Sequence, residues 1–233
     1  MKRLLLIVLP LLLIVGCSKP ISEETLIDKD GLKYHPETKE LYSGEVFTNF
    51  MGGKPKLEGS YKDGLMNGNW VGWYENGQKE WEGKYKNGDG SDLGETRISR
   101  NGRNGIWTFW YENGQKKREI NYKYGKEDGS VIEWYKNGQK SGEGTYINGK
   151  PDRLVTQWYK NGQKKFEGTY KDGEIDGLWT EWYENGQKKL QHNVKDGKLD
   201  GLVTEWFVNR QMKFERTYKD GEIDGLWTEW YEN

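Results

Sequence analysis

Few side chains in this chain are of the types that carry out covalent or metal chemistry. The 233 residues include one cysteine, Cys17, and two histidines, His35 and His192. A lone cysteine excludes a disulfide within the chain and a metal site built from several cysteines. Neither histidine lies beside a recurring serine or carboxylate that could complete a catalytic group, and the many acidic residues fall in expected turns and strand surfaces. We therefore expect no enzyme activity, no cofactor and no metal centre.

One loop has side-chain oxygens at the alternating positions that calcium loops use. It runs from Asn87 to Asp92, but its twelfth position, which should be acidic, is Ile98. A complete calcium-binding loop is thereby excluded. We expect an extended surface loop here, with a weak calcium site as the alternative.

The chemistry that the sequence predicts for Cys17 is lipidation. Residues 1–16 begin with two basic residues and continue as an apolar run. The run is shorter than the roughly 20 residues that span a membrane, but it is typical of a secretory signal peptide. It ends in Ile14-Val15-Gly16-Cys17, which resembles the bacterial lipobox, in which the cysteine is acylated and becomes the new N-terminus. The resemblance implies cleavage after residue 16 and a membrane anchor of several acyl chains, palmitate among them, on Cys17.

The lipid anchor implies an address in the cell envelope. Ser18 follows the cysteine, and because an aspartate there would favour the inner membrane, serine favours the outer membrane if the organism has two. Residues 17–35 are polar and carry no repeat, so we expect the lipidated cysteine and a short tether over this range.

The remaining residues, 36–233, are built on a repeat of about 24 residues. Its marker, Asn-Gly-Gln or a variant of it, recurs at intervals of 24 from Asn113 to Asn233, and Asn76 precedes Asn113 by 37, so one copy is 13 residues longer. A tryptophan lies three places before each of these asparagines: Trp73, Trp110, Trp134, Trp158, Trp182, Trp206 and Trp230. The next position is always aromatic: Tyr74, Tyr111, Tyr135, Tyr159, Tyr183, Phe207 and Tyr231.

This repeat predicts two strands of roughly 6–8 residues and two turns in each copy. Asn-Gly tolerates a positive φ at both positions of a tight turn, and Lys-Asp-Gly returns the chain for the next hairpin. Glycine interrupts every stretch before a helix of three turns could form. We therefore expect an all-β fold, a solenoid-like array of stacked antiparallel β-hairpin repeats. A two-residue hairpin places Trp179, Tyr183 and Leu190 on one face of the sheet and Leu178, Thr180 and Trp182 on the other.

The composition agrees with such an array and excludes some partners. Hydrophobic residues make up 33% of the chain, yet 12 Trp and 15 Tyr bring the aromatic content to 14%, and there are 32 Gly. A thin core of aromatic layers with frequent turns fits these values. The 36 basic and 37 acidic residues are interspersed, and loss of the leader leaves 34 against 37, a net charge of −3. We therefore expect no nucleic-acid partner.

With the repeat established, the chain resembles the bacterial variant of the MORN repeat. The pattern Gly-x-Trp-x-x-Trp-Tyr-x-Asn-Gly-Gln-Lys is typical of that family and is seen in Gly177–Tyr183 and Asn161–Gly173. The resemblance covers about residues 36–233. Bacterial proteins of this kind are often labelled YwqK-type antitoxins, by similarity to an immunity protein that neutralises a secreted toxin, and MORN arrays elsewhere are associated with protein scaffolding and lipid binding. The leader ending at Cys17 departs from a cytoplasmic antitoxin and implies a role at the envelope.

Two functions remain open at this point. The first is a non-enzymatic envelope scaffold that binds a protein partner, with toxin immunity as one form of it. The alternative is a module that binds cell-wall glycan or choline in aromatic pockets between hairpins, since the Trp-x-x-Trp-Tyr pattern also resembles choline-binding repeats. The last repeat is incomplete at Asn233. Either the sequence is truncated there, or the unpaired last strand offers an edge to a partner or for self-association.

Overall fold

The computed structural model describes residues 19–91 and 99–232, and almost all of their regular structure is β-strand. The predicted signal peptide and Cys17 lie outside these residues. The one helix among them is the single turn of 3₁₀ helix η1 (Glu23–Thr25), and no helix in this part of the chain is long and apolar enough to cross a membrane.

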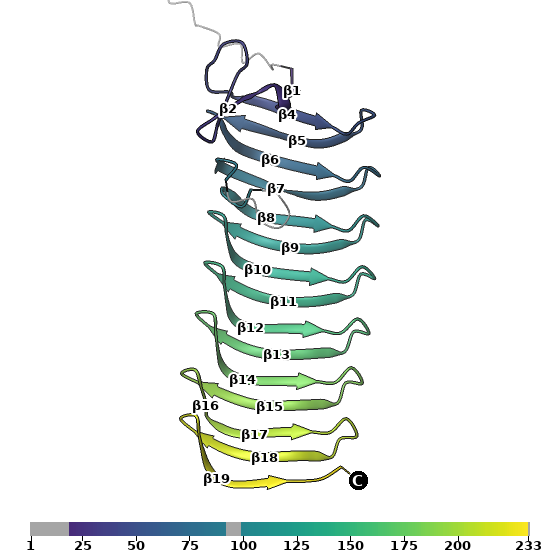
Figure 1. Ribbon diagram of the computed structural model, residues 1–233, viewed down its shortest axis with the longest axis vertical. Coiled ribbons are helices and arrows are strands. Elements are labelled where there is room, and N and C mark those ends of the chain that lie inside the picture. The colour runs from purple at the N-terminus through teal and green to yellow at the C-terminus, as the bar shows by residue number, and fades with distance from the viewer. Residues whose placement is uncertain (1–18, 92–98, 233) are drawn as a thin grey trace, which may run out of the picture.

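The hairpins stack in chain order into one sheet of 17 strands, with each strand paired to its sequence neighbours (Figure 1). The first strands are β1 (Ile21–Ser22), β2 (Ile27–Lys29), β3 (Leu32–Tyr34), β4 (Gly44–Asn49), β5 (Pro55–Lys62), β6 (Leu65–Trp73) and β7 (Lys79–Gly88). The middle strands are β8 (Arg103–Trp110), β9 (Lys116–Lys123), β10 (Lys126–Trp134), β11 (Lys140–Ile147), β12 (Lys150–Trp158) and β13 (Lys164–Lys171). The last strands are β14 (Glu174–Trp182), β15 (Lys188–Lys195), β16 (Lys198–Leu199), β17 (Gly201–Trp206), β18 (Met212–Lys219) and β19 (Glu222–Glu229).

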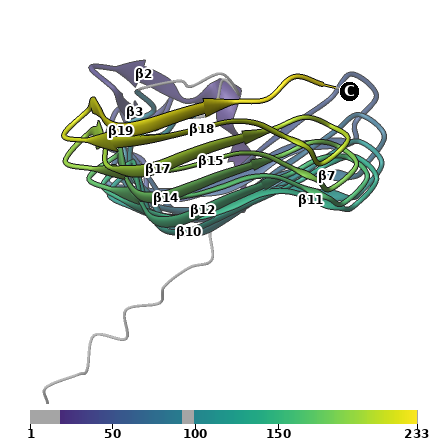
Figure 2. The same cartoon turned by 90° about the horizontal axis from the view of Figure 1, so that it is seen from below.

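All pairs in the large sheet are antiparallel except β1 with β4, which is parallel. Strands β2 and β3 form a separate two-stranded sheet. The sheet is bowed, and Figure 2 shows β2 and β3 on its hollow side. The predicted fold class, an all-β array of stacked hairpins, is confirmed.

The two turns of each repeat differ from the expectation. At the Asn-Gly turn the Tyr159 N–H donates to the Gln163 carbonyl, at 2.8 Å, and the Gly162 N–H donates to the Tyr159 carbonyl. Only Gly162 has a positive φ, +85°, so this is a three-residue loop and not the predicted two-residue one. The two-residue turn with two positive φ values is the second one, where Asp172 has +54° and Gly173 has +93°.

The predicted distribution of side chains over the two faces nevertheless holds. Glu181 pairs with Leu190, and Trp179 pairs with His192. These are the pairs that a two-residue hairpin would give. The three-residue loop shifts the pairing by one residue, and a bulge at Lys189 shifts it back. We define the concave face as the face of the sheet that carries Trp179 and Leu190. At the N-terminal end, the segment that contains η1, β2 and β3 covers this face, and Tyr61 on β5 donates a hydrogen bond to Glu23 of η1 at 2.7 Å.

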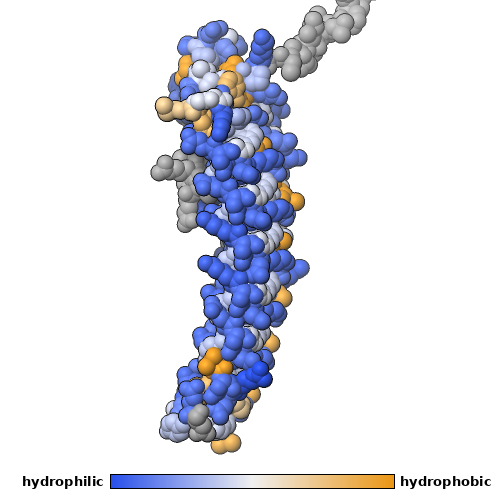
Figure 3. Space-filling model, turned by 90° about the vertical axis from the view of Figure 1, so that its right-hand side faces the viewer, coloured by the Kyte–Doolittle hydropathy of each residue, from blue (hydrophilic) through white to orange (hydrophobic). Residues whose placement is uncertain are grey.

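The convex face carries the alternate residues and is more open to solvent. Five exposed aliphatic side chains recur on it, one each in five copies of the repeat: Ile106, Leu154, Leu178, Leu202 and Leu226. Figure 3 shows hydrophobic side chains recurring along one side of an otherwise hydrophilic array. The buried side chains of the core therefore lie mainly on the concave face.

The core is a row of aromatic rings that lie against glycine. Trp70 and Trp107 are fully buried, and Tyr85 packs edge-on between them, with ring centres 5.9 and 4.9 Å from theirs. Each tryptophan covers a glycine of the neighbouring strand, so that a Cβ on Gly59 or Gly83 would lie 2.1 or 2.2 Å from the ring. Trp179 covers Gly168 in the same way. Glycine is therefore needed at these positions for the space it leaves and not for its backbone freedom.

This packing makes a prediction for Gly168. Gly168→Ala places a methyl group 2.2 Å from the Trp179 ring, and we expect a loss of about 1–3 kcal/mol in the free energy of unfolding because the ring must move. Thermal and urea unfolding measure it.

The control is Gly142→Ala, in the preceding repeat, where the nearest atom to the new Cβ is 3.5 Å away. We expect that variant to be neutral or more stable by roughly 0.5 kcal/mol. Equal stability of the two variants would contradict the role assigned to the ring.

Candidate binding site on the concave face

The predicted tryptophan column lies on the convex face, and lysines among the described residues cover five of its seven rings, all but Trp73 and Trp230. The lysine that follows each Asn-Gly-Gln lies over the tryptophan of the next repeat, as Lys140 does over Trp158 at 5.9 Å and Lys164 over Trp182 at 5.5 Å. The same contact occurs at Trp110, Trp134 and Trp206. Most of these lysines also pair with a glutamate three residues later, at 2.5–2.6 Å. These exposed pairs add little stability, but they cover the rings.

The predicted tyrosine column joins consecutive repeats. Each hydroxyl donates to the backbone carbonyl of the tryptophan in the next repeat, as Tyr159 does to Trp182 at 2.9 Å. The same bond is made by Tyr74, Tyr111, Tyr135 and Tyr183. The turn asparagines act similarly, since Asn161 donates to the Glu184 carbonyl and accepts from the Gln163 N–H. The two aromatic columns therefore have a structural role within the array.

The residues singled out for covalent or metal chemistry are not brought together. Cys17 lies outside the described residues. His35 accepts hydrogen bonds from the backbone of its own turn, and His192 stacks on Trp179, where burial lowers its pKa. Within residues 19–91 and 99–232, no three His, Cys, Asp or Glu residues form a group that could hold a metal ion.

Part of the predicted calcium loop also lies outside the described residues. Asp92 and Ile98 are not described, whereas Asp89 accepts a hydrogen bond from the Ser91 N–H at 2.9 Å. Hydrogen bonds from Ser91 hold the pKa of the Asp89 carboxyl below its usual value. In the described part of this loop, the aspartate oxygen is therefore used by the backbone of the loop itself.

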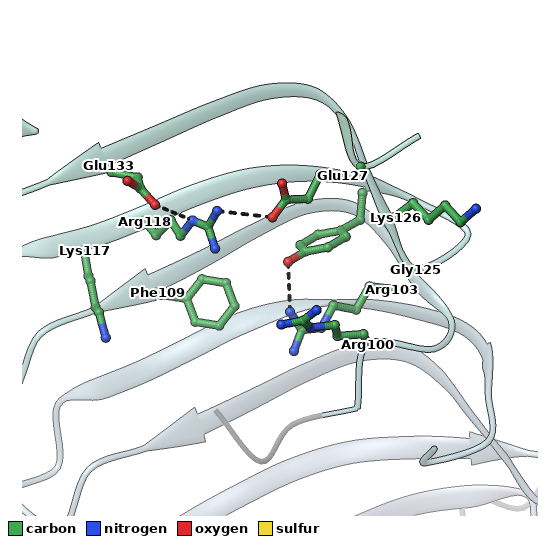
Figure 4. A pocket seen from close by; sticks show the side chains of 11 residues that line it. Arg100, Arg103, Phe109, Lys117, Arg118, Gly125, Lys126, Glu127 and Glu133 are labelled. Atoms are coloured by element: carbon green, nitrogen blue, oxygen red, sulfur yellow. Dashed lines mark hydrogen bonds and ion pairs between the residues drawn. The ribbon is translucent and has the colours of Figure 1, made fainter. Parts of the chain in front are cut away.

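The concave face opens into a cavity where the aromatic core thins out. Val131 and Val155 occupy the positions that Trp107 and Trp179 hold in the adjacent copies, so the layer of rings is interrupted. The cavity beside this interruption has a volume of about 550 Å³. It is lined by Arg100, Arg103, Phe109, Lys117, Arg118, Tyr122, Gly125, Lys126, Glu127, Glu133 and Gly149 (Figure 4). We call it the basic cavity.

Arg103 forms the floor of the basic cavity and is 2% exposed. Its Nε donates to the Ser99 carbonyl at 2.9 Å and its Nη1 donates to the Tyr122 hydroxyl at 3.1 Å. Its guanidinium lies 4.4 Å from the centre of the Trp107 ring, a favourable cation–π arrangement. The hydroxyl of Tyr85 donates to the same Ser99 carbonyl, and burial raises the pKa of Tyr85 to about 12, although Arg103 opposes the shift.

Arg118 crosses the cavity between two carboxylates. Its Nη2 lies 3.2 Å from Glu127 and its Nε lies 2.8 Å from Glu133, which belong to the next repeat. Figure 4 shows the guanidinium pointing between the two glutamates, with the Phe109 ring beside it. Five basic and two acidic side chains line the cavity, so the sum of their formal charges is 5 − 2 = +3 in a chain whose net charge is −1.

The sequence interpretation missed the basic cavity, although the repeat contained a signal for it. Arg118 stands where later copies have Phe166, Leu190 or Phe214. Arg103 stands where Ile175 and Ile223 occur. A comparison of the copies position by position would have indicated Arg118, the one charged residue in its column, and the exchange of Arg103 and Glu127 for isoleucine in later copies.

Comparison with known proteins agrees with the repeat assignment. Four consecutive segments, residues 103–124, 127–148, 154–172 and 175–196, match the family model described as MORN repeat variant. They correspond to the hairpins from β8–β9 to β14–β15, and the basic cavity lies over the first two. The predicted resemblance to the MORN repeat is confirmed for these four repeats. No curated protein matches the chain.

The structural role of the tyrosine column gives a testable expectation. Tyr159→Phe removes only the hydroxyl that bonds the Trp182 carbonyl, and we expect it to lower the free energy of unfolding by about 1 kcal/mol. Tyr124→Phe is the control, because that ring is 74% exposed; it should leave stability unchanged. If Tyr159→Phe unfolds at the same denaturant concentration as the parent, the hydroxyl bond contributes nothing to joining the repeats.

Proposed function

We propose that this protein is a non-enzymatic lipoprotein of the bacterial cell envelope whose repeat array binds a protein partner on its concave face. The repeats supply an extended and regular surface, and such arrays commonly use a concave surface for binding. The observation that carries the proposal is the basic cavity, an opening in the aromatic core that is lined by charged side chains. Packing of the hairpins does not require such an opening.

The anchor in this proposal is Cys17. The basic start, the apolar run and the sequence Val-Gly-Cys at its end support acylation of this residue, and several acyl chains would hold the protein stably at a membrane. The outer membrane is the proposed location if the organism has two. The partner in the immunity form of the proposal is a toxin domain that meets the array at the envelope.

The covered tryptophan rings favour this proposal over the glycan or choline alternative. A choline-binding site places a quaternary ammonium over an aromatic face. In five repeats the ammonium of a lysine of the chain lies there, as Lys188 does over Trp206 at 5.6 Å. A ligand ammonium would have to displace that lysine in each repeat.

The anchor is tested by Cys17→Ser. We expect the parent protein, produced in a diderm bacterium, to incorporate labelled palmitate and to enter the detergent phase on phase separation. The variant should incorporate none, because serine is not acylated in this way. A parent protein without label would remove the lipoprotein part of the proposal.

Partner binding is tested by capture on two matched variants of β12. Gln157 lies on the concave face and Leu154 on the convex face of the same strand. The purified parent protein, immobilised and exposed to envelope and secreted extracts, should retain one stoichiometric protein identified by mass spectrometry. Gln157→Trp should abolish its retention, because the large neutral ring blocks the face that the partner covers, and Leu154→Trp should not.

Three other outcomes of the capture experiment would count against the proposal. Loss of the partner with Leu154→Trp alone would move the binding site to the convex face and contradict the proposal. Retention of cell-wall glycan without protein would support the alternative function. If neither is retained near physiological salt, the scaffold proposal fails.

A further inference from the structure

We infer that the basic cavity is the docking site for an acidic peptide segment of the partner, one that places carboxylates against the rim cations and an apolar side chain against Phe109. This inference rests on the proposed function and goes beyond it by naming the chemistry of the partner.

The rim of the cavity carries three cations, of which Lys117 also lies 5.7 Å from the centre of the Tyr111 ring and opposes the burial that raises the pKa of Glu80. Arg100, Lys117 and Lys126 are exposed, and none of them lies within ion-pair distance of a carboxylate among residues 19–91 and 99–232. Figure 4 shows Lys117 on one side of the Phe109 ring and Arg100 on the other. A bound carboxylate would therefore gain hydrogen-bonded cations without breaking an existing pair.

The glutamates in the cavity decide which kind of anion fits. Glu127 and Glu133 hold Arg118 between them, so a continuous polyanion laid along the cavity would bring phosphates against carboxylates. A nucleic-acid strand or an anionic membrane surface is disfavoured for this reason. A peptide can place carboxylates against the rim cations and a neutral side chain near Glu127 and Glu133, so that like charges do not meet.

The floor supplies an apolar contact of suitable size. Phe109 is 8% exposed and lines the cavity, and the volume of about 550 Å³ lies within the range typical of ligand sites. In the five later copies the position of Phe109 is held by Glu133, Gln157, Glu181, Glu205 and Glu229. The combination of apolar floor and basic rim is therefore particular to this place and does not follow from the repeat.

Fluorescence anisotropy on the full chain tests the inference. The probe is a fluorescein-labelled peptide, Gly-Glu-Leu-Glu-Gly, with Gly-Gln-Leu-Gln-Gly as its neutral counterpart. We expect the acidic peptide alone to bind, and its affinity to fall as salt is raised from about 0.1 M to about 1 M. The double variant Lys117→Glu/Lys126→Glu should weaken binding at least about tenfold.

The matched control uses the same repeat positions outside the cavity. Lys165 and Lys150 are the exposed counterparts of Lys117 and Lys126 in the next copies that carry lysine at these positions. Lys150→Glu/Lys165→Glu changes the net charge by the same amount, and we expect the affinity to stay within about twofold of the parent. Thermal unfolding shows that both variants are folded.

Four results would overturn the inference: no binding of the acidic peptide, equal binding of the neutral peptide, equal loss in the control variant, or tighter binding of oligothymidylate or of phosphatidylglycerol vesicles at the cavity. If any of them occurs while the capture experiment still retains a partner that Gln157→Trp no longer binds, the proposed function stands and only the acidic-segment inference fails.

Discussion

The contact on which the array depends is a tryptophan ring lying flat over a glycine of the neighbouring strand. A sheet in which both faces meet water has little depth in which to bury apolar area, and a ring laid along the sheet covers more of it than an aliphatic side chain could. The glycine beneath allows the ring to approach the backbone. The tyrosines packed edge-on against Trp70 and Trp107 then close the gaps between successive rings. The thin aromatic core follows from this one arrangement.

The basic cavity is a consequence of the same arrangement. Where Val131 replaces the tryptophan, the row of rings is interrupted, and the rings of Phe109 and Tyr122 remain at the edge of an opening. Arg103 tolerates burial there because a tyrosine hydroxyl, a carbonyl and three aromatic rings surround it. Arg118 lies on β9, opposite Phe109, and forms ion pairs with Glu127 and Glu133 of the next repeat. The charged cavity therefore lies at the boundary between a repeat with tryptophan at this position, Trp107, and one with valine, Val131.

Most of the fold could be predicted from the spacing of Asn-Gly-Gln and of the aromatic residues. The period, the hairpins and the two faces of β14 followed from it. The turn types were assigned to the wrong turns, because Asn-Gly suits a two-residue turn and also a three-residue loop, and only the pairing of Tyr159 with Gln163 distinguishes them. The cavity was not predicted, because it arises from what a repeat lacks at Val131 and not from a motif that recurs. The anchoring of Cys17 stays a prediction from sequence.

The bonds that join the repeats connect each one only to its neighbour. The tyrosine and asparagine bonds from Tyr111 to Tyr183 all span 23 residues, so no residue in this ladder depends on a repeat two places away. An array of this kind can be lengthened or shortened by recombination between copies, with the cost confined to the new junction. Residues 169–185 and 217–233 are identical in sequence, as a recent duplication would leave them. The length of the array can therefore change by whole repeats during evolution, while the residues of the proposed binding site stay the same.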